Sequence, residues 1–173
     1  GDASPQLRQI AVGNDVTADE LGQTISAQMI EQGYRSEEDS IFCLASSNCL
    51  VAKLSPGAAN AVPSHDALSF QLEEMLPVSA EHFVTDFVTS KSGILGIAVV
   101  TETIRPLVQA LEVAGISIRS IVPATLLATQ SLIQPPASLA ADSAILVWPF
   151  DGAFDVIRIQ DGVISDWLYV RGD

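Results

Sequence analysis

The stretch LSFQLEEMLPVSAEHFVTDF, residues 68–87, carries the pattern that decides the fold class of the chain. Its first half has apolar residues at helical spacing, and Pro77 stands where the helix is expected to end. Apolar and polar residues alternate over residues 82–88, which is typical of a half-buried strand. The stretch therefore predicts a short amphipathic helix, with Gln71 and Glu74 facing outward, followed by a strand. The apolar stripe of this helix consists of Leu68, Leu72, Met75 and Leu76.

Upstream of this stretch, the sequence predicts one helix and two strands. Thr17-Ala18-Asp19-Glu20 is a capping box, in which the Thr hydroxyl accepts a backbone N–H and the Glu side chain reaches back to the cap. Gly33 is a suitable residue to end the helix that follows. The apolar runs 41–45 and 49–54 flank Ser46-Ser47-Asn48, and this arrangement predicts a β-hairpin.

Downstream, predicted strands and helices alternate. Ile94–Val100 is a nearly unbroken apolar run, as expected for a central strand that is covered on both faces. A helix ending near Gly115 follows, with Pro106 in its first turn, where a missing N–H costs little. The order of elements predicts an α/β fold with mixed sheets and packed helices. The other predicted elements are a strand at 117–122, a helix at 124–133, and strands at 144–148, 154–160 and 163–170.

The composition narrows the class of protein and the kind of partner. The chain has 173 residues, of which 48% are apolar and 17% charged, and its formal net charge is −13. This charge argues against a nucleic acid or an anionic membrane surface as partner. No apolar run reaches the ~18 residues that span a bilayer, so a soluble chain is expected. Two interpretations of the charge stay open: solubility alone, or an acidic face that attracts a basic partner.

A Pro-rich segment, Gln134-Pro135-Pro136-Ala137-Ser138, is the best candidate for a linker. It predicts a first lobe of helices and mixed sheet over residues 1–134, and the start of a second lobe of hairpin strands over residues 135–173. A single continuous domain is the alternative.

Residues that commonly carry catalysis do not form a recognisable set. His65 and His82 lie in no catalytic motif, and the chain has neither a nucleophile elbow nor a Gly-rich phosphate loop. Cys43 and Cys49 have no His nearby to complete a zinc site, so we expect buried free thiols. Adjacent helical carboxylates point in different directions, which favours a solvated surface for Glu73, Glu74 and Glu81. We therefore predict no catalytic residue, no cofactor and no metal site.

Two short motifs resemble a known family. Glu73-Glu74-Met75-Leu76-Pro77, followed by Asp86-Phe87, resembles a segment of actin-like proteins of bacterial envelope machines. These are the type IV pilus assembly proteins of the PilM kind and the cytoplasmic domain of the type II secretion L subunit. Residues 41–55, 94–128 and 145–171 are similar to the strand pair, the strand–helix–strand–helix unit and the hairpin that surround this segment in the family. The resemblance implies a fragment of the actin-like, RNase H-like ATPase fold.

The same resemblance implies a function. Nucleotide-binding members carry an Asp-x-Gly loop in the first hairpin of each lobe. Here nothing before residue 17 fits such a loop, and Trp148-Pro149 stand where small loop residues belong in the second hairpin. The chain therefore resembles the non-catalytic, secretion-type members, which implies a scaffold module on the cytoplasmic side of the bacterial inner membrane. The alternative is a nucleotide-binding ATPase or kinase fragment that uses Asp151-Gly152 as a phosphate loop.

The partners implied by the resemblance are the assembly ATPase of the secretion or pilus machine and a membrane-proximal platform subunit. A homodimer is a further prediction. We expect the partner-binding residues to be Gln71, Glu74 and Glu81, on the acidic side of the helix and just beyond it.

Overall fold

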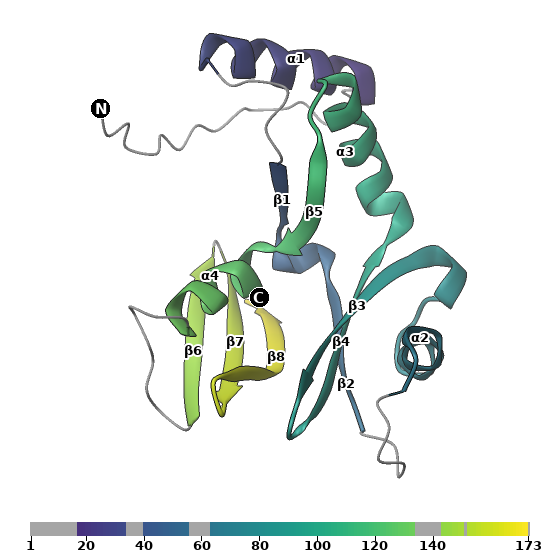
Figure 1. Ribbon diagram of the computed structural model, residues 1–173, viewed down its shortest axis with the longest axis vertical. Coiled ribbons are helices and arrows are strands. Elements are labelled where there is room, and N and C mark those ends of the chain that lie inside the picture. Colours follow the sequence, from purple (N-terminus) through teal and green to yellow (C-terminus); the bar gives the residue numbers. More distant parts are fainter. Residues whose placement is uncertain (1–16, 34–39, 56–62, 134–142, 151, 173) are drawn as a thin grey trace. The chain divides into compact units, whose positions relative to one another are not determined.

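The computed structural model describes residues 17–33, 40–55, 63–133, 143–150 and 152–172, and Figure 1 shows the elements that they form. The contacts between residues divide the chain into two units. The first unit combines residues 1–39 with 105–117, and the second combines residues 40–104 with 118–173.

The first unit is built on two helices, α1 (Ala18–Glu31) and the greater part of α3 (Thr101–Val113). The predicted capping box is confirmed: Glu20 N donates to Thr17 Oγ1 at 3.3 Å, and Thr17 N donates to Glu20 Oε2 at 2.9 Å. The helices approach closely at Gly22, where an added Cβ would lie 2.5 Å from a backbone carbonyl oxygen of α3. A residue without a Cβ is therefore needed at this crossing.

The second unit contains an antiparallel sheet with the strand order β2-β4-β3. Its strands are β2 (Leu50–Leu54), β4 (Gly93–Val100) and β3 (Phe83–Ser90). Every residue of β4 except Val100 is buried. The prediction of a central strand covered on both faces is thus confirmed, and the burial of so many apolar side chains stabilises the sheet.

One face of this sheet is covered by α2 (His65–Glu73). Leu68 and Leu72 are buried there among apolar side chains of the sheet. Gly96 of β4 allows the helix to lie close, because an added Cβ would stand 2.9 Å from Leu72 Cδ1. Met75, which the helical spacing placed on the buried stripe, is 55% exposed because the helix ends before it.

The hairpin predicted around Ser46–Asn48 is wrong. β1 (Ser40–Leu44) pairs in parallel with β5 (Ile118–Pro123), whereas β2 pairs with β4. Ser46–Asn48 form a 3₁₀ helix, η1, which leads the chain from one sheet into the other. Burial favours this arrangement, because Leu44 and Leu54 are each buried in a different apolar cluster.

The last three strands form an antiparallel sheet, which we call the C-terminal sheet. Its order is β6 (Ser143–Phe150), β7 (Ala153–Gln160) and β8 (Val163–Arg171). The predicted turn at Asp161-Gly162 is confirmed, with φ angles of 53° and 73° that suit a two-residue hairpin loop. The predicted lobe boundary at 134–135 lies outside the described residues.

A shared core joins the inner side of the C-terminal sheet to β1, to α4 (Ala124–Ile133) and to the face of β4 that α2 does not cover. β4 thus contributes to two clusters on its opposite faces. This arrangement confirms the predicted α/β fold with mixed sheets and packed helices. Buried members of the shared core include Leu44, Leu95, Ile97, Val99, Leu126, Ile157 and Trp167.

Three local predictions need correction. α2 ends ahead of Pro77, with Glu74 as its C-cap. Pro106 lies beyond the first turn of α3, where its missing N–H removes an intrahelical hydrogen bond. Cys43 is exposed and only Cys49 is buried, because alternate side chains of β1 point to opposite faces of its sheet.

Candidate functional site: an apolar cleft and a buried carboxylate

An apolar cleft of about 430 Å³ opens within the second unit. Part of its lining is core, such as Leu44 and Leu126, which are buried. Another part faces solvent, because Val84 is 51% exposed and Ile121 is 36% exposed. The lining residues are Leu44, Val84, Thr85, Asp86, Val88, Ile97, Val99, Ile104, Ile121, Val122, Pro123, Leu126 and Gln130.

The polar groups of the cleft are few. Thr85, Asp86 and Gln130 are the polar residues of its lining, and Asp86 is the one among them with a carboxyl group. Asp86 is exposed, and its Oδ1 accepts a hydrogen bond from Phe87 N at 2.8 Å. The lining contains no second acid or base to work with this carboxylate, and the Thr85 hydroxyl lies 3.1 Å from Ser69 Oγ, with which it shares a hydrogen bond. The cleft is suited to holding an apolar chain segment whose polar end meets Asp86.

A second feature is a carboxylate in the core. Asp155 of β7 has no exposed surface. Its Oδ2 accepts hydrogen bonds from Ser46 Oγ and from Thr125 Oγ1, the latter at 2.5 Å. Its Oδ1 accepts a bond from Trp167 Nε1 at 2.9 Å. The hydroxyls of Ser46 and Thr125 also lie 2.9 Å apart. We call these four residues the Asp155 network.

The Asp155 network connects four elements: η1, the start of α4, β7 and β8. A neighbouring bond from Trp148 Nε1 to Thr129 Oγ1, at 3.3 Å, ties β6 to α4 as well. Among the described residues, no basic side chain forms an ion pair with Asp155. A buried carboxylate without hydrogen-bond donors would be very costly. The donors therefore account for its presence, and the network holds the C-terminal sheet against α4 and η1.

Cys49 lies in the same core. Burial raises the pKa of its thiol to about 11, with a smaller contribution from the negative charge of Asp155. Its Sγ donates a weak bond to Ala45 O at 3.7 Å. Because the thiolate is the reactive form of cysteine, Cys49 acts as a packing residue at neutral pH and not as a nucleophile.

The predicted partner-binding residues lie on α2 and on η2 (Ala80–His82), away from the lining of the cleft. Glu74 is exposed at the end of α2, and Gln71 is half-buried. Glu81 is exposed, and its Oε1 lies 3.5 Å from His82 Nε2. The other ring nitrogen of His82, Nδ1, lies 3.6 Å from Glu102 Oε1. Their role in binding stays a prediction.

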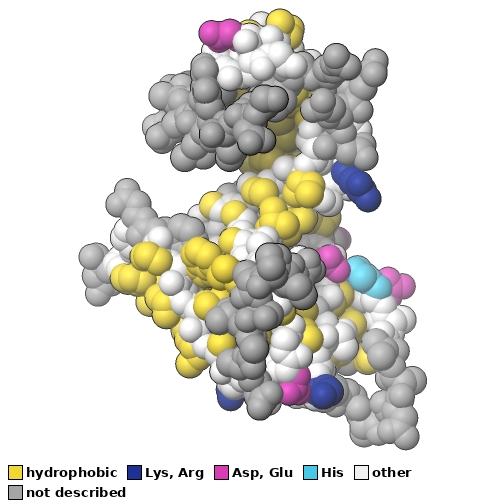
Figure 2. All heavy atoms as spheres, turned by 60° about the vertical axis from the view of Figure 1, so that its left-hand side comes forward, with side chains coloured by type: hydrophobic (Ala, Val, Ile, Leu, Met, Phe, Trp, Pro, Cys, Tyr) yellow, Lys and Arg dark blue, Asp and Glu magenta, His cyan; other side chains and the backbone are white. Residues whose placement is uncertain are grey.

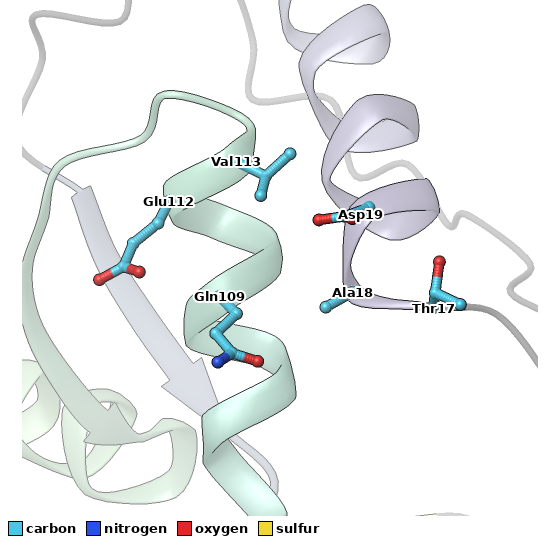
Figure 3. A pocket seen from close by; sticks show the side chains of 6 residues that line it. All are labelled: Thr17, Ala18, Asp19, Gln109, Glu112 and Val113. Carbon is cyan, nitrogen blue, oxygen red and sulfur yellow. The ribbon is translucent and has the colours of Figure 1, made fainter.

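Figure 3 shows another hollow, which lies within the first unit between the start of α1 and α3. Asp19 and Val113 point into the space between the helices, whereas Glu112 points away from α1. The Thr17 hydroxyl is already engaged with Glu20 in the capping box. The polar groups of this hollow are two carboxylates, the amide of Gln109 and one hydroxyl that is already hydrogen-bonded, which gives it little to bind a ligand with.

Sequence reasoning missed the Asp155 network, although one local signal points to it. The inward positions of β7 are occupied by Ala153, Asp155, Ile157 and Ile159, all buried. A carboxylate on the apolar side of an alternating strand predicts either a partner in the core or a functional site.

Comparisons with known proteins identify the fold. No protein-family model matches the chain, and no curated protein matches its sequence. Solved structures do match. A chain of the PilM-PilN type IV pilus biogenesis complex has a TM-score of 0.69 and 16% identity, over 89% of this chain and 48% of that one. The cytoplasmic domain of EpsL, an inner membrane component of the type II secretion system of Vibrio cholerae, has a TM-score of 0.60 and 12% identity, over 94% of this chain and 60% of that one.

The fold is actin-like, as in PilM and the EpsL domain. The resemblance inferred from residues 73–87 is confirmed at the level of the actin-like fold, although this chain spans only 48% and 60% of the two matching chains. Within the described part of this actin-like chain, no helix is long and apolar enough to cross a membrane. The same residues contain no group of three or more His, Cys, Asp or Glu side chains arranged to hold a metal ion.

Proposed function

We propose that this chain is a docking module of a type II secretion or type IV pilus assembly platform. It lies on the cytoplasmic side of the bacterial inner membrane and binds partner subunits without turning over a substrate. The apolar cleft supports this proposal best, because its lining combines buried apolar walls with exposed apolar side chains and one carboxylate. The actin-like fold, shared with a chain of the PilM-PilN complex and with EpsL, supports the setting.

The cleft is the docking site for the membrane-proximal platform subunit. Its volume of about 430 Å³ accommodates a few large apolar side chains of an inserted segment. Val84 and Ile121 remain exposed until such a segment covers them. Asp86 then lies where it can accept a hydrogen bond or pair with a basic residue of the segment.

A matched pair of valines tests this assignment. Val84→Asp places a charge in the cleft, and Val147→Asp places the same charge outside the cleft. The two sites are similarly exposed, at 51% for Val84 and 55% for Val147. We expect Val84→Asp to weaken binding of the partner's cytoplasmic segment at least about tenfold, because an unpaired charge in an apolar contact is costly. Val147→Asp should leave that affinity unchanged. Equal binding by both variants and the wild type would remove the cleft from the interface.

The acidic surface of α2 and η2 is the docking site for the assembly ATPase. Glu74 and Glu81 are exposed there and Gln71 is half-buried. Phe70, 65% exposed on the same helix, offers an apolar anchor beside these polar groups. Because the chain carries a net charge of −13, a partner with basic residues around an apolar pocket would be attracted to this surface.

A charge-reversal experiment tests the ATPase assignment. Glu74→Lys with Glu81→Lys should weaken capture of purified ATPase without changing the melting temperature, because both side chains are exposed. Glu31→Lys with Glu112→Lys makes the same change in net charge on exposed residues of other helices. A loss of binding in both double variants would mean that overall charge, not this surface, attracts the ATPase.

The actin-like fold also favours one other candidate, a nucleotide-binding ATPase or kinase fragment with Asp151-Gly152 as its phosphate loop. Asp151 lies outside the described residues, so the test is a solution measurement. Calorimetry with ATP and magnesium should detect no binding if the chain is a docking module. Micromolar binding that Asp151→Ala abolishes would establish the nucleotide-binding function instead.

A further inference from the structure

Two long strands stand at the edges of their sheets. Among the described residues, β3 pairs with β4 alone and β8 pairs with β7 alone. The two strands have eight and nine residues, more than the commonest strand length of about five or six. The backbone N–H and C=O groups along such an edge form a template on which a strand of another chain can add.

The side chains of the two edge strands favour such addition. Val84 of β3 and Leu168 and Val170 of β8 are apolar, and their exposed fractions are 51%, 59% and 39%. Figure 2, in which the β6 side of Figure 1 comes forward, shows hydrophobic side chains gathered on this side with few charged ones. Apolar strands with free edges aggregate by strand addition unless their edge groups are occupied.

On β3, side chains of the chain itself occupy the edge groups at the middle of the strand. The Phe87 N–H donates to Asp86 Oδ1 at 2.8 Å, and His65 Nε2 lies 3.4 Å from Thr85 O. Both backbone groups therefore point away from β4, towards the free edge. An added antiparallel strand exchanges two hydrogen bonds with every second residue of an edge. The donor of Phe87 and the acceptor of Thr85 are already engaged, so neither residue is ready to form both bonds.

The imidazole of His65 is fixed beside this edge by contacts with α2 and β3. Its ring is in T-shaped contact with the ring of Phe87, and the two ring centroids are 5.1 Å apart. Its Nδ1 lies 3.5 Å from Ser69 Oγ, and Ser69 Oγ shares a hydrogen bond of 3.1 Å with the Thr85 hydroxyl. The start of α2 therefore covers the carbonyl that β3 would offer to an added strand.

β8 has the same arrangement as β3. The Trp167 N–H donates to Asp166 Oδ1 at 3.0 Å, just as the N–H of Phe87 donates to Asp86. Each edge strand thus contains an Asp followed by an aromatic residue whose N–H the carboxylate holds. In the middle strand β7, by contrast, the carboxylate of Asp155 accepts hydrogen bonds from core side chains.

A bulge further disrupts the edge of β8. The register shifts there, because Arg158 of β7 pairs with Asp166 whereas Ile159 pairs with Ile164. Ser165 is the extra residue, and its hydroxyl donates to Arg158 O at 3.2 Å. A bulge bends and twists an edge strand away from regular pairing. It therefore acts together with the occupied N–H of the neighbouring Trp167.

We propose that Asp86 and Asp166 close the edges of β3 and β8 to strand addition, each by holding the N–H of the residue that follows it. A hydrogen bond to a carboxylate is stronger than one between neutral groups, so an incoming strand must displace a good acceptor. The charge of the carboxylate also repels a second copy of the chain, whose net charge is −13. The proposal does not rest on the docking function, because it concerns hydrogen bonds within the chain.

Amide hydrogen exchange of the full chain, followed by NMR, tests the two hydrogen bonds. After correction for the neighbouring side chain, Asp86→Ala should speed exchange of the Phe87 N–H at least about tenfold, because its acceptor is lost. The Trp167 N–H should keep its wild-type rate in this variant. Asp166→Ala should have the reverse effect, so each variant is the control for the other. A Phe87 N–H that exchanges at the wild-type rate in Asp86→Ala would overturn the proposal.

Aggregation of the folded chain, followed by light scattering and thioflavin T fluorescence, tests whether the edge is closed. Asp86→Ala should aggregate at least about tenfold faster than the wild type, whereas Asp86→Asn, which keeps an acceptor oxygen, should stay close to it. Asp19→Ala removes the same charge from an exposed residue of α1 and is the control. Urea denaturation of each variant separates edge association from unfolding.

Two outcomes of the aggregation experiment would contradict the proposal. If Asp86→Ala aggregates no faster than Asp19→Ala, the carboxylate does not close the edge of β3. If Asp86→Asn aggregates as fast as Asp86→Ala, charge alone keeps the chains apart and the hydrogen bond to the Phe87 N–H has no such role.

Discussion

Removal of the buried carboxylate in Asp155→Ala is the most informative test of how the second unit is held together. Asp155 has no exposed surface and accepts three hydrogen bonds, from Ser46, Thr125 and Trp167. In the alanine variant the indole N–H of Trp167 loses its acceptor inside the core. The hydroxyls of Ser46 and Thr125 can still hydrogen-bond to each other, because they lie 2.9 Å apart. The free energy that they lose with the carboxylate is therefore smaller.

The expected magnitude follows from these contacts. A buried donor left without an acceptor costs about 1–3 kcal/mol, and each weakened hydroxyl bond costs about 0.5–1.5 kcal/mol. The cavity left by the carboxylate adds about 1 kcal/mol. We therefore expect Asp155→Ala to lower the free energy of unfolding by about 4 kcal/mol, a large part of the 5–15 kcal/mol typical of a domain. Asp155→Asn keeps the volume and one acceptor oxygen, so it should cost about half as much.

Urea denaturation followed by tryptophan fluorescence is a direct assay, because both tryptophans of the chain, Trp148 and Trp167, belong to or pack against the shared core. Asp86→Ala serves as the control, since that carboxylate is exposed and accepts a hydrogen bond from the backbone N–H of its neighbour Phe87. It should change stability by less than about 0.5 kcal/mol. If Asp155→Ala were within about 1 kcal/mol of the wild type, or if Asp155→Asn cost as much as Asp155→Ala, the hydrogen bonds to Asp155 would not be what ties these elements together.

Three further predictions concern Cys49 and Gly96. At pH 8 iodoacetamide should alkylate the exposed Cys43 readily and Cys49 only after unfolding. The reason is that raising the Cys49 pKa from 9.0 to about 11 lowers its thiolate fraction roughly a hundredfold. Equal alkylation rates in the two single-cysteine variants would contradict this prediction. The same raised pKa means that its contribution to stability is full below pH 9 and is lost as the pH rises towards 11. Gly96→Ala should lower the free energy of unfolding by about 1–3 kcal/mol by overpacking against Leu72. In a Leu72→Val background, the cost of Gly96→Ala should be smaller. If the costs of the two substitutions simply add in the double variant, the contact with Leu72 is not the cause of the destabilisation.

The parts of the fold that sequence predicted correctly are those that depend on short-range patterns. The capping box at Thr17, the turn at Asp161-Gly162 and the central strand at Ile94–Val100 each rest on fewer than ten neighbouring residues. The hairpin prediction failed because strand pairing is a long-range choice. β1 lies parallel to β5, more than seventy residues away, where Leu44 is buried in the shared core, and β2 pairs with β4 instead. The turn-like sequence Ser46-Ser47-Asn48 between two apolar runs does not determine which strands those runs pair with.

The candidate site shows the same division between local and long-range information. The outward position of Glu74 was predictable from helical spacing alone, whereas the cleft takes residues from β1, β3, β4, β5 and two helices. Asp155 lies between these cases. Its inward position in an alternating strand is visible in the sequence, but Ser46 is 109 residues away and Thr125 is 30. A polar residue that breaks a local pattern identifies the place where the fold needs a partner, and the partner can be named only when the whole fold is known. For this chain the missing partners are donors from η1, α4 and β8, which is why the carboxylate acts as a structural tie and not as a catalytic group.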